Sequence, residues 1–258
     1  MREGDFLALL KIPDELRDRA GECGYNSLII MAGMFDKLDI ESKLLSYEGY
    51  FGVGYAIASF FSASANPLQC RLEQFLEFRL QESDKSRELE DDYQKLARQS
   101  LEHVITTGGI LPVSNGLRPE LLSERAGVFV SLHKNGRLRG CIGTIAPSTG
   151  SVAEEIIQNA ISAGLSDTRF TPVLEDELPY LSFKVDVLSA PEKISGPHEL
   201  DVKRYGVIVT SGMRRGLLLP NLDGVDTIEE QIEIAKNKAG ISESTEVKLE
   251  RFEVIRHG

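Results

Sequence analysis

The chain is poor in cysteine and has no long hydrophobic run. Its three cysteines, Cys23, Cys70 and Cys141, are far apart in the sequence, so they predict neither a disulfide framework nor a zinc site of paired cysteines. The most apolar stretches, 28–35 and 53–61, are too short to span a bilayer. No long apolar segment follows the charged start, so we expect no signal peptide. These features predict a cytoplasmic protein without a membrane partner.

Positive charge is also scarce. The chain has 29 Lys and Arg residues against 40 Asp and Glu residues, a formal net charge of −11. This balance disfavours nucleic acid as a partner, because nucleic acid attracts basic surfaces, but it leaves room for a local basic pocket that takes a small anionic ligand. The sequence also lacks the glycine-rich, histidine and serine motifs of nucleotide-binding proteins, metalloproteases and hydrolases. No metal and no cofactor are therefore predicted.

The sequence does contain regular patterns of short helices and strands. Apolar residues recur with helical spacing, or follow helix caps, in the segments 93–105, 151–163 and 227–240. Apolar and polar residues alternate over 128–132 and 181–187, which is typical of strands with one solvated face. Asn135-Gly136 indicates a hairpin turn, and a slip in the apolar period between Leu249 and Phe252 indicates a bulge. Hairpins mixed with helices predict an α+β fold, with an antiparallel or mixed sheet and flanking helices.

Composition divides the chain into three parts. Residues 62–67 are small and polar and end in proline, and a charged stretch follows, so we place a linker at 62–90 with a short helix at 68–80. Residues 1–61 are expected to form short helices, one capped by Asn26-Ser27, and then two strands at 40–47 and 53–61. About sixty residues are marginal for an independent domain. We interpret 1–61 as a small αβ fragment and 91–258 as the main domain.

The segment Gly136–Gly143, with the sequence GRLRGCIG, carries the most informative chemistry. If the segment is extended, Arg137, Arg139 and Cys141 share one face. A positive charge beside a thiol favours the thiolate, which is the reactive form. The segment therefore predicts a reactive cysteine on a cationic face. The alternative is a small structural cysteine, since free cysteine is among the most buried residue types.

Residues from about Asp92 to the end resemble the AMMECR family, also called AmmeMemoRadiSam system protein A. The resemblance covers roughly two-thirds of the chain and is carried by AGVFVSL at 126–132 with the glycine-flanked cysteine segment, Asn159-Ala160, SDTRF at 166–170, RYGVIV at 204–209, RRGLLLP at 214–220, GVDTIEEQ at 224–231, and RFEV at 251–254 before His257. It implies an AMMECR-type domain over 91–258. It also implies partnership with a Memo-like protein and a radical S-adenosylmethionine enzyme. The reaction of the family is not established, so the resemblance indicates partners rather than chemistry.

Residues 1–61 resemble the C-terminal end of the class III extradiol dioxygenase and Memo-like family. The matching segments are AGECG at 20–24, LLSYEG at 44–49 and FGVGY at 51–55. The resemblance implies a C-terminal remnant of such a domain. Residues 1–61 contain no histidine, so they cannot supply the two histidines that a facial-triad iron site needs. Ring cleavage is therefore not predicted for this chain.

Four residues in and after the expected helix 151–163 are further candidates for the site. Glu155 and Asn159 are four positions apart and so share a helix face. Glu155 is a candidate general acid or base, with a solvated helix face as the alternative, and the family resemblance supports Asn159 as a substrate-binding residue. Asp167 and Arg169 form either a pair that pins the following turn or a clamp for substrate.

A cysteine nucleophile needs a base, and two histidines are candidates. His257 is one, although it lies one residue from the end, where chains fray. His133 is the alternative, because its strand is expected to pair with the strand of Cys141. Arg139 and Arg215 are candidates for binding an anionic substrate, since guanidinium binds carboxylate or phosphate with two parallel hydrogen bonds. For Arg215 the alternative is a charged hairpin tip.

Two functions stay open at this point, and a third, a pocket that reads RNA or a base, is disfavoured by the acidic net charge. The first is an enzyme or enzyme subunit that uses Cys141 on a small anionic or nucleotide-like substrate. The second is a non-catalytic module whose groove at Arg139 and Cys141 binds a ligand or a protein.

Overall fold

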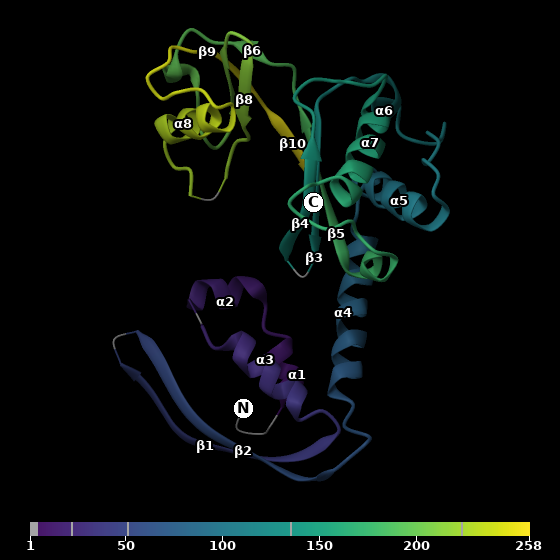
Figure 1. The fold of residues 1–258 in the computed structure, drawn as a ribbon, viewed down its shortest axis with the longest axis vertical. Helices are drawn as coiled ribbons and strands as arrows, with labels where there is room; N and C mark the ends of the chain where they lie inside the picture. Colours follow the sequence, from purple (N-terminus) through teal and green to yellow (C-terminus); the bar gives the residue numbers. More distant parts are fainter. Residues whose placement is uncertain (1–4, 22, 51, 135, 223) are drawn as a thin grey trace. The chain divides into compact units, whose positions relative to one another are not determined.

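The computed structural model describes residues 5–21, 23–50, 52–134, 136–222 and 224–258. The chain divides into two compact units, Met1–Lys85 and Ser86–Gly258. Helices are combined with antiparallel sheets (Figure 1), which confirms the predicted α+β fold. In the described ranges no helix is both long and apolar enough to cross a membrane. The predicted turn residue Asn135 falls outside the described residues.

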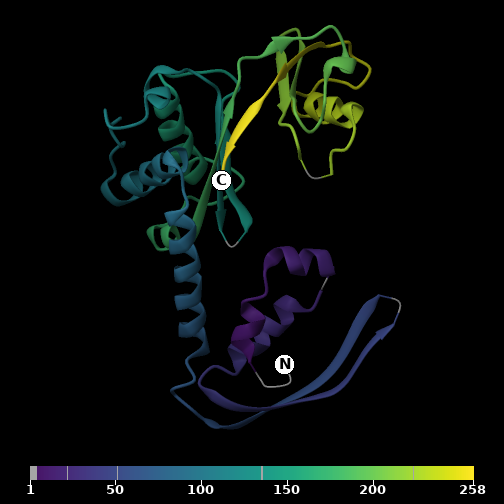
Figure 2. The same ribbon diagram turned by 180° about the vertical axis from the view of Figure 1, so that it is seen from behind.

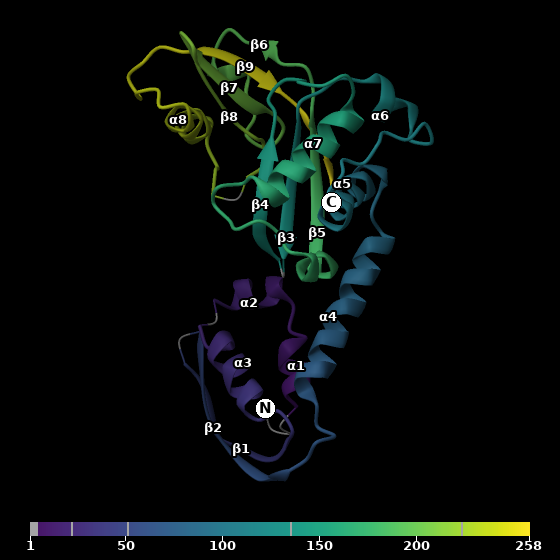
Figure 3. The same ribbon diagram turned by 45° about the vertical axis from the view of Figure 1, so that its right-hand side comes forward.

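The first unit combines a long β-hairpin with short helices (Figure 3). Its elements are α1 (Phe6–Leu10), α2 (Asp14–Ala20), α3 (Tyr25–Met34), β1 (Leu38–Tyr50), β2 (Val53–Ala65) and most of α4 (Arg71–Glu88). The rings of Phe6, Phe35 and Phe60 pack together, with centroids 5.6 to 6.4 Å apart, and form a small aromatic core between the helices and the hairpin.

Several boundaries in this unit differ from the predictions. Both strands are longer than expected, so residue 62, the expected start of the linker, lies inside β2. The helix expected at 68–80 is Arg71–Glu88. Helix α3 begins at Tyr25 after Gly24, so Asn26 and Ser27 lie inside the helix and do not cap it.

The second unit begins with a sheet that helices cover on one face. The strands are β3 (Val128–Lys134), β4 (Arg137–Gly143), β5 (Leu181–Leu188) and β10 (Val254–His257), in the antiparallel order β10-β5-β3-β4. The helices are α5 (Asp92–Thr107), α6 (Pro119–Ser123) and α7 (Val152–Leu165), and a 3₁₀ helix covers Glu175–Tyr180. Figure 3 shows α7 crossing the face of β3 and β4. The helix ends follow the sequence, because Asp91 and Ser151 accept capping hydrogen bonds and Gly108 ends α5 at φ 74°.

A core fills the space between this sheet and its helices. The strands contribute Val128, Val130 and Leu132 from β3 together with Phe183 and Val185 from β5, all fully buried. Each of these side chains stabilises the fold by roughly 1.5–3 kcal/mol relative to an exposed position. Because strand side chains alternate, the residues between them must point to the opposite face.

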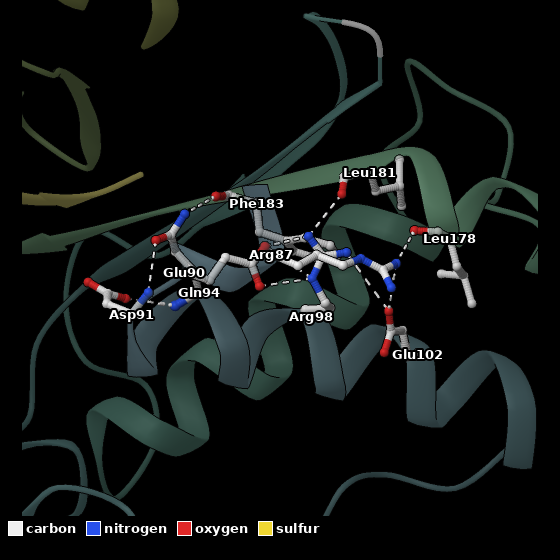
Figure 4. Close-up of polar contacts among 9 residues, drawn as sticks. All are labelled: Arg87, Glu90, Asp91, Gln94, Arg98, Glu102, Leu178, Leu181 and Phe183. Atoms are coloured by element: carbon white, nitrogen blue, oxygen red, sulfur yellow. Dashed lines mark hydrogen bonds and ion pairs between the residues drawn. The ribbon is translucent and has the colours of Figure 1, made fainter. Parts of the chain in front are cut away.

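A buried ion pair fixes α5 against β5. Figure 4 shows Arg98 donating to both oxygens of Glu90, with Nε–O distances of 3.0 and 2.9 Å, and to the carbonyl of Leu181 at 2.9 Å. Gln94 also donates to the carbonyl of Phe183 at 2.8 Å. These bonds hold the backbone of β5 and so position the side chains that β5 presents on its other face.

A second sheet follows, in the order β6-β9-β7-β8. Its elements are β6 (Glu192–Lys193), a 3₁₀ turn at Pro197–Glu199, β7 (Gly206–Ser211), β8 (Arg214–Leu218), α8 (Ile228–Lys238) and β9 (Lys248–Phe252). The predicted capping box at Thr227 is present and begins α8. Figure 2 shows the C-terminal chain running from this sheet into the first. The slip in the apolar period near Phe252 therefore marks a change of sheet between β9 and β10, and the predicted bulge there is wrong.

Candidate functional site

A cavity of about 740 Å³ lies on the face of the first sheet opposite its helices. From β3 it is lined by Phe129, Ser131 and His133, the residues that alternate with the buried ones. From the second sheet, β8 and the loop after it form the other wall. We call it the inter-sheet cavity; its lining is Phe129, Ser131, His133, Cys141, Ile145, Lys184, Asp186, Arg215–Leu217, Leu219, Leu222, Lys238 and Arg256–Gly258.

Cys141 lies on β4 and lines this cavity, half-buried. It pairs with Ser131 on β3, whose hydroxyl donates a hydrogen bond to Sγ at 3.1 Å. The flanking glycines are required by close approaches: a Cβ at Gly140 would lie 2.1 Å from the carbonyl oxygen of Ala163, and one at Gly143 would lie 2.2 Å from the ring of Phe129. The GCIG segment thus lets α7 pack closely against β4 on the helix side of the sheet and lets the Phe129 ring lie close to the strand.

Asp167 and Arg169 hold the backbone of Cys141 in place. β4 is an edge strand, so its outer backbone groups have no neighbouring strand. The N–H of Cys141 donates to Asp167 Oδ2 at 2.9 Å, and Arg169 donates to the carbonyl of Cys141 at 3.1 Å. The two side chains also pair with each other at 2.9 and 2.6 Å. The arrangement corresponds to the pinning interpretation, and neither side chain lines the cavity.

The charges of this clamp reinforce each other. Hydrogen bonds from Arg169 hold the pKa of Asp167 far below its usual range; burial opposes this, and the N–H of Cys141 adds to it. The same pairing raises the pKa of Arg169. A cationic group therefore does lie beside Cys141, but it comes from Arg169.

Arg139 lies elsewhere. A register shift between Leu132 and His133 interrupts the alternation of β4. Arg139 pairs with Glu177 at 2.8 Å and donates to the carbonyl of Thr171 at 2.9 Å, and it does not line the cavity. The prediction that Arg139 and Cys141 share a face is wrong, because the sequence gives no sign of the extra residue in this strand.

Glu155 and Asn159 lie beneath the loop 144–149 and do not line the cavity. Glu155 is buried and accepts hydrogen bonds from the hydroxyls of Thr144, Ser148 and Thr149 and from two backbone N–H groups. Burial raises the pKa of Glu155, but these hydrogen bonds outweigh burial and lower it. Asn159 donates to the carbonyl of Val128 at 2.9 Å. The structure therefore does not bring Glu155 together with Cys141. Glu155 and Asn159 instead hold the loop 144–149 and the start of β3 in place.

The two candidate histidines differ in their surroundings. His257 pairs with Val185, whose side chain faces the helices. Its imidazole stacks on Tyr93 at 3.8 Å between centroids, and its Nδ1 lies 2.5 Å from Asp91. His257 is thus held firmly, contrary to the concern about fraying. The residue borders the inter-sheet cavity, but its ring is engaged by Tyr93 and Asp91 on the helix side of the sheet.

His133 faces the cavity. Burial, with a further contribution from Lys184, lowers the pKa of His133, so its imidazole is neutral and able to accept a proton at neutral pH. Within the described residues its buried Nδ1 has no hydrogen-bond partner. Buried polar atoms are almost always satisfied, so this nitrogen is an exception among the polar atoms of the site.

The charged side chains of the cavity are mostly cationic. Lys184, Arg215, Lys238 and Arg256 stand against one carboxylate, Asp186. This balance is the reverse of the net charge of the chain, and it creates a local basic pocket. Of the two arginines predicted to bind an anion, Arg215 lines the cavity, paired with Glu250 at 3.0 Å, and Arg139 does not.

Sequence reasoning missed Lys184, Asp186 and Arg256. The signal for the first two was the alternation in β5, which we interpreted as a solvated face. Asp186 lies 3.7 Å from Arg256. Burial raises the pKa of Asp186, and Arg256, Lys184 and His257 oppose that effect. In the part of the chain that the structure describes, no group of three or more His, Cys, Asp or Glu side chains is placed to bind a metal ion.

Comparison with known proteins identifies related chains. The profile of the AMMECR1 family matches residues 94–257. A protein of Clostridium acetobutylicum is 45% identical over 258 residues, which is all of this chain and 54% of that protein, so this chain spans about half of its length. A protein of Thermotoga maritima is 49% identical over 170 residues, covering 65% of this chain and 98% of the other.

A solved structure is also similar. The crystal structure of an uncharacterised protein from Pyrococcus horikoshii has a TM-score of 0.58 and 34% sequence identity, over 64% of this chain and 88% of the other. The Thermotoga protein consists almost entirely of the matched region.

Proposed function

This chain belongs to the AMMECR1 family, and we propose that it is a cysteine-dependent enzyme, or a subunit of one, that acts on a small anionic substrate in the inter-sheet cavity. The observation that carries the proposal is the convergence of a half-buried thiol with four cationic side chains in one cavity. A cationic wall attracts an anion and would hold it beside the sulfur.

In this proposal Cys141 is the nucleophile. The hydroxyl of Ser131 donates a hydrogen bond to its sulfur at 3.1 Å. His133 is the base that takes the thiol proton. As Sγ bonds to the substrate, the bond between the substrate and its leaving group breaks, and His133 gives the proton to that leaving group. Asp167 and Arg169 position the thiol by holding both backbone groups of Cys141. Glu155 and Asn159 have positioning roles, and Arg215 joins Lys184 in binding the anion.

The partners are a separate part of the proposal. A Memo-like protein and a radical S-adenosylmethionine enzyme are proposed from the resemblance alone, as is the origin of residues 1–61 in a dioxygenase-like or Memo-like domain. A relative of about twice this length that matches the whole chain is compatible with such an additional domain. Co-purification of the tagged chain with each candidate partner tests the association, and recovery of neither partner contradicts it.

Alkylation of Cys141 tests the catalytic proposal. The rate with iodoacetamide at pH 7 is measured by peptide mass spectrometry in the folded chain and in the chain unfolded by urea. We expect the folded chain to react about tenfold faster. His133→Asn should slow the reaction, and the matched control His103→Asn, on α5 away from the cavity, should not. A folded thiol slower than the unfolded one contradicts the enzyme and favours the alternative, a non-catalytic binding module.

A further inference from the structure

We infer that the ligand of the inter-sheet cavity is an amphipathic organic anion, a carboxylate or phosphate joined to an apolar ring or chain. The inference rests on the proposed function and deepens it by naming the substrate class. Two independent features of the cavity support it: an apolar wall, and a row of polar groups that separates the charge from the thiol.

The apolar wall is formed by side chains from both sheets. It consists of Phe129 and Ile145 on one side and Leu217, Leu219 and Leu222 on the other. All five are only partly buried within the chain. Covering partly exposed apolar surface is favourable at roughly 25 cal/mol per Å². A bare inorganic anion gains nothing from such a wall, whereas a ring or short chain does.

The charge lies at a distance from the thiol. Cys141, Ser131 and Lys184 are register partners on three adjacent strands, so their side chains form one row across the sheet. The outer two strands of such a row are about 10 Å apart. Lys184 is exposed and has no ion pair among the described residues. An anionic group bound by Lys184 therefore leaves room for an organic body between the charge and the atom that meets Sγ.

The two arginines of the cavity are less available. Arg215 is paired with Glu250, and Arg256 donates to the carbonyls of Pro220 and Asn221. Lys184 and Lys238 are exposed and have no ion pair among the described residues, and Lys184 is the one that lies in the same row as Cys141. A volume of about 740 Å³ is that of a cavity for an organic molecule and far exceeds the needs of a single phosphate.

Calorimetric titration of the full chain with three probes tests the inference. Phenyl phosphate carries both a charge and an apolar ring. Inorganic phosphate carries the charge alone, and phenol carries the ring alone. We expect phenyl phosphate to bind at least about tenfold more tightly than either of the others. Lys184→Gln should weaken phenyl phosphate binding about tenfold without affecting phenol. The control Lys95→Gln, an exposed lysine on α5 that does not line the cavity, should leave both unchanged.

The outcomes separate this inference from the proposed function. If inorganic phosphate and phenyl phosphate bind equally, the ligand needs no organic part and the inference is overturned. If phenol binds most tightly, the ligand needs no anionic group and the inference is again overturned. If no probe binds, neither part of the inferred ligand is supported and the inference fails. Titration of Cys141→Ser completes the test, because it removes the thiol and keeps the cavity. If phenyl phosphate still binds Cys141→Ser while Cys141 proves unreactive in the wild type, the ligand class stands and the catalytic proposal fails.

Discussion

The ion pair between Arg139 and Glu177 gives a quantitative test of the structure. Hydrogen bonds from Arg139 lower the pKa of Glu177 from 4.5 to about 2; burial opposes this, and Lys134 adds to it. The Glu177 side chain is only 15% exposed, so solvent screens the pair weakly. The difference between the two pKa values, at about 1.36 kcal/mol for each pH unit, corresponds to about 3 kcal/mol of stability at pH 7.

The sign of the pH dependence follows from the lowered pKa. A carboxyl group with a depressed folded-state pKa stabilises the fold fully above its unfolded pKa, here 4.5, and loses that contribution as the pH falls toward the folded value. Glu177→Gln should therefore lower the free energy of unfolding by about 3 kcal/mol at pH 7 and by about half as much at pH 3.

Urea unfolding followed by circular dichroism between pH 3 and pH 7 measures both quantities. Glu175→Gln is the matched control, because Glu175 lies in the same 3₁₀ helix but is exposed; we expect a change within about 0.5 kcal/mol. If the curves of Glu177→Gln and the wild type run parallel over this pH range, the reasoning about the ion pair is refuted.

Two further predictions concern stability. Arg98→Met leaves the buried carboxylate of Glu90 without its partner and should lower the free energy of unfolding in urea by about 3–5 kcal/mol. Adding Glu90→Leu should recover most of this loss. If Arg98→Met alone is as stable as the double variant, an unpaired buried charge is not the cause. Gly140→Ala places a Cβ 2.1 Å from the carbonyl of Ala163 and should cost about 2 kcal/mol or more. Gly109→Ala, which meets only ordinary contacts, is its control, and equal unfolding midpoints for the two variants would count against the close approach of α7 and β4.

The local features of the fold were predictable from the sequence. The capping box at Thr227 and the stop at Gly108 depend on neighbours within a few residues, and both are present. The same is true of the alternation in β3 and β5. Local hydrogen bonds and side-chain periodicity carry these predictions.

The predictions that failed concern features that depend on contacts between distant segments. The register shift beside Arg139 depends on how β4 pairs with β3. We predicted that the β5 face with Lys184 and Asp186 is solvated, because the sequence does not reveal that a second sheet lies opposite it. The fixing of His257 depends on Tyr93 and Asp91, more than 160 residues away. Cys141 was found because its segment is distinctive, whereas its cationic neighbour, Arg169, comes from a separate loop.

Competition among the three cysteines tests the central claim most directly. Cys23 is exposed, and burial together with Glu73 raises the pKa of the Cys70 thiol. The folded chain is treated with less than one equivalent of iodoacetate, and the modified peptides are quantified by mass spectrometry. Our account predicts that Cys141 is modified first, ahead of the more exposed Cys23, because the cationic cavity attracts the anionic reagent. Modification of Cys23 before Cys141 would contradict it.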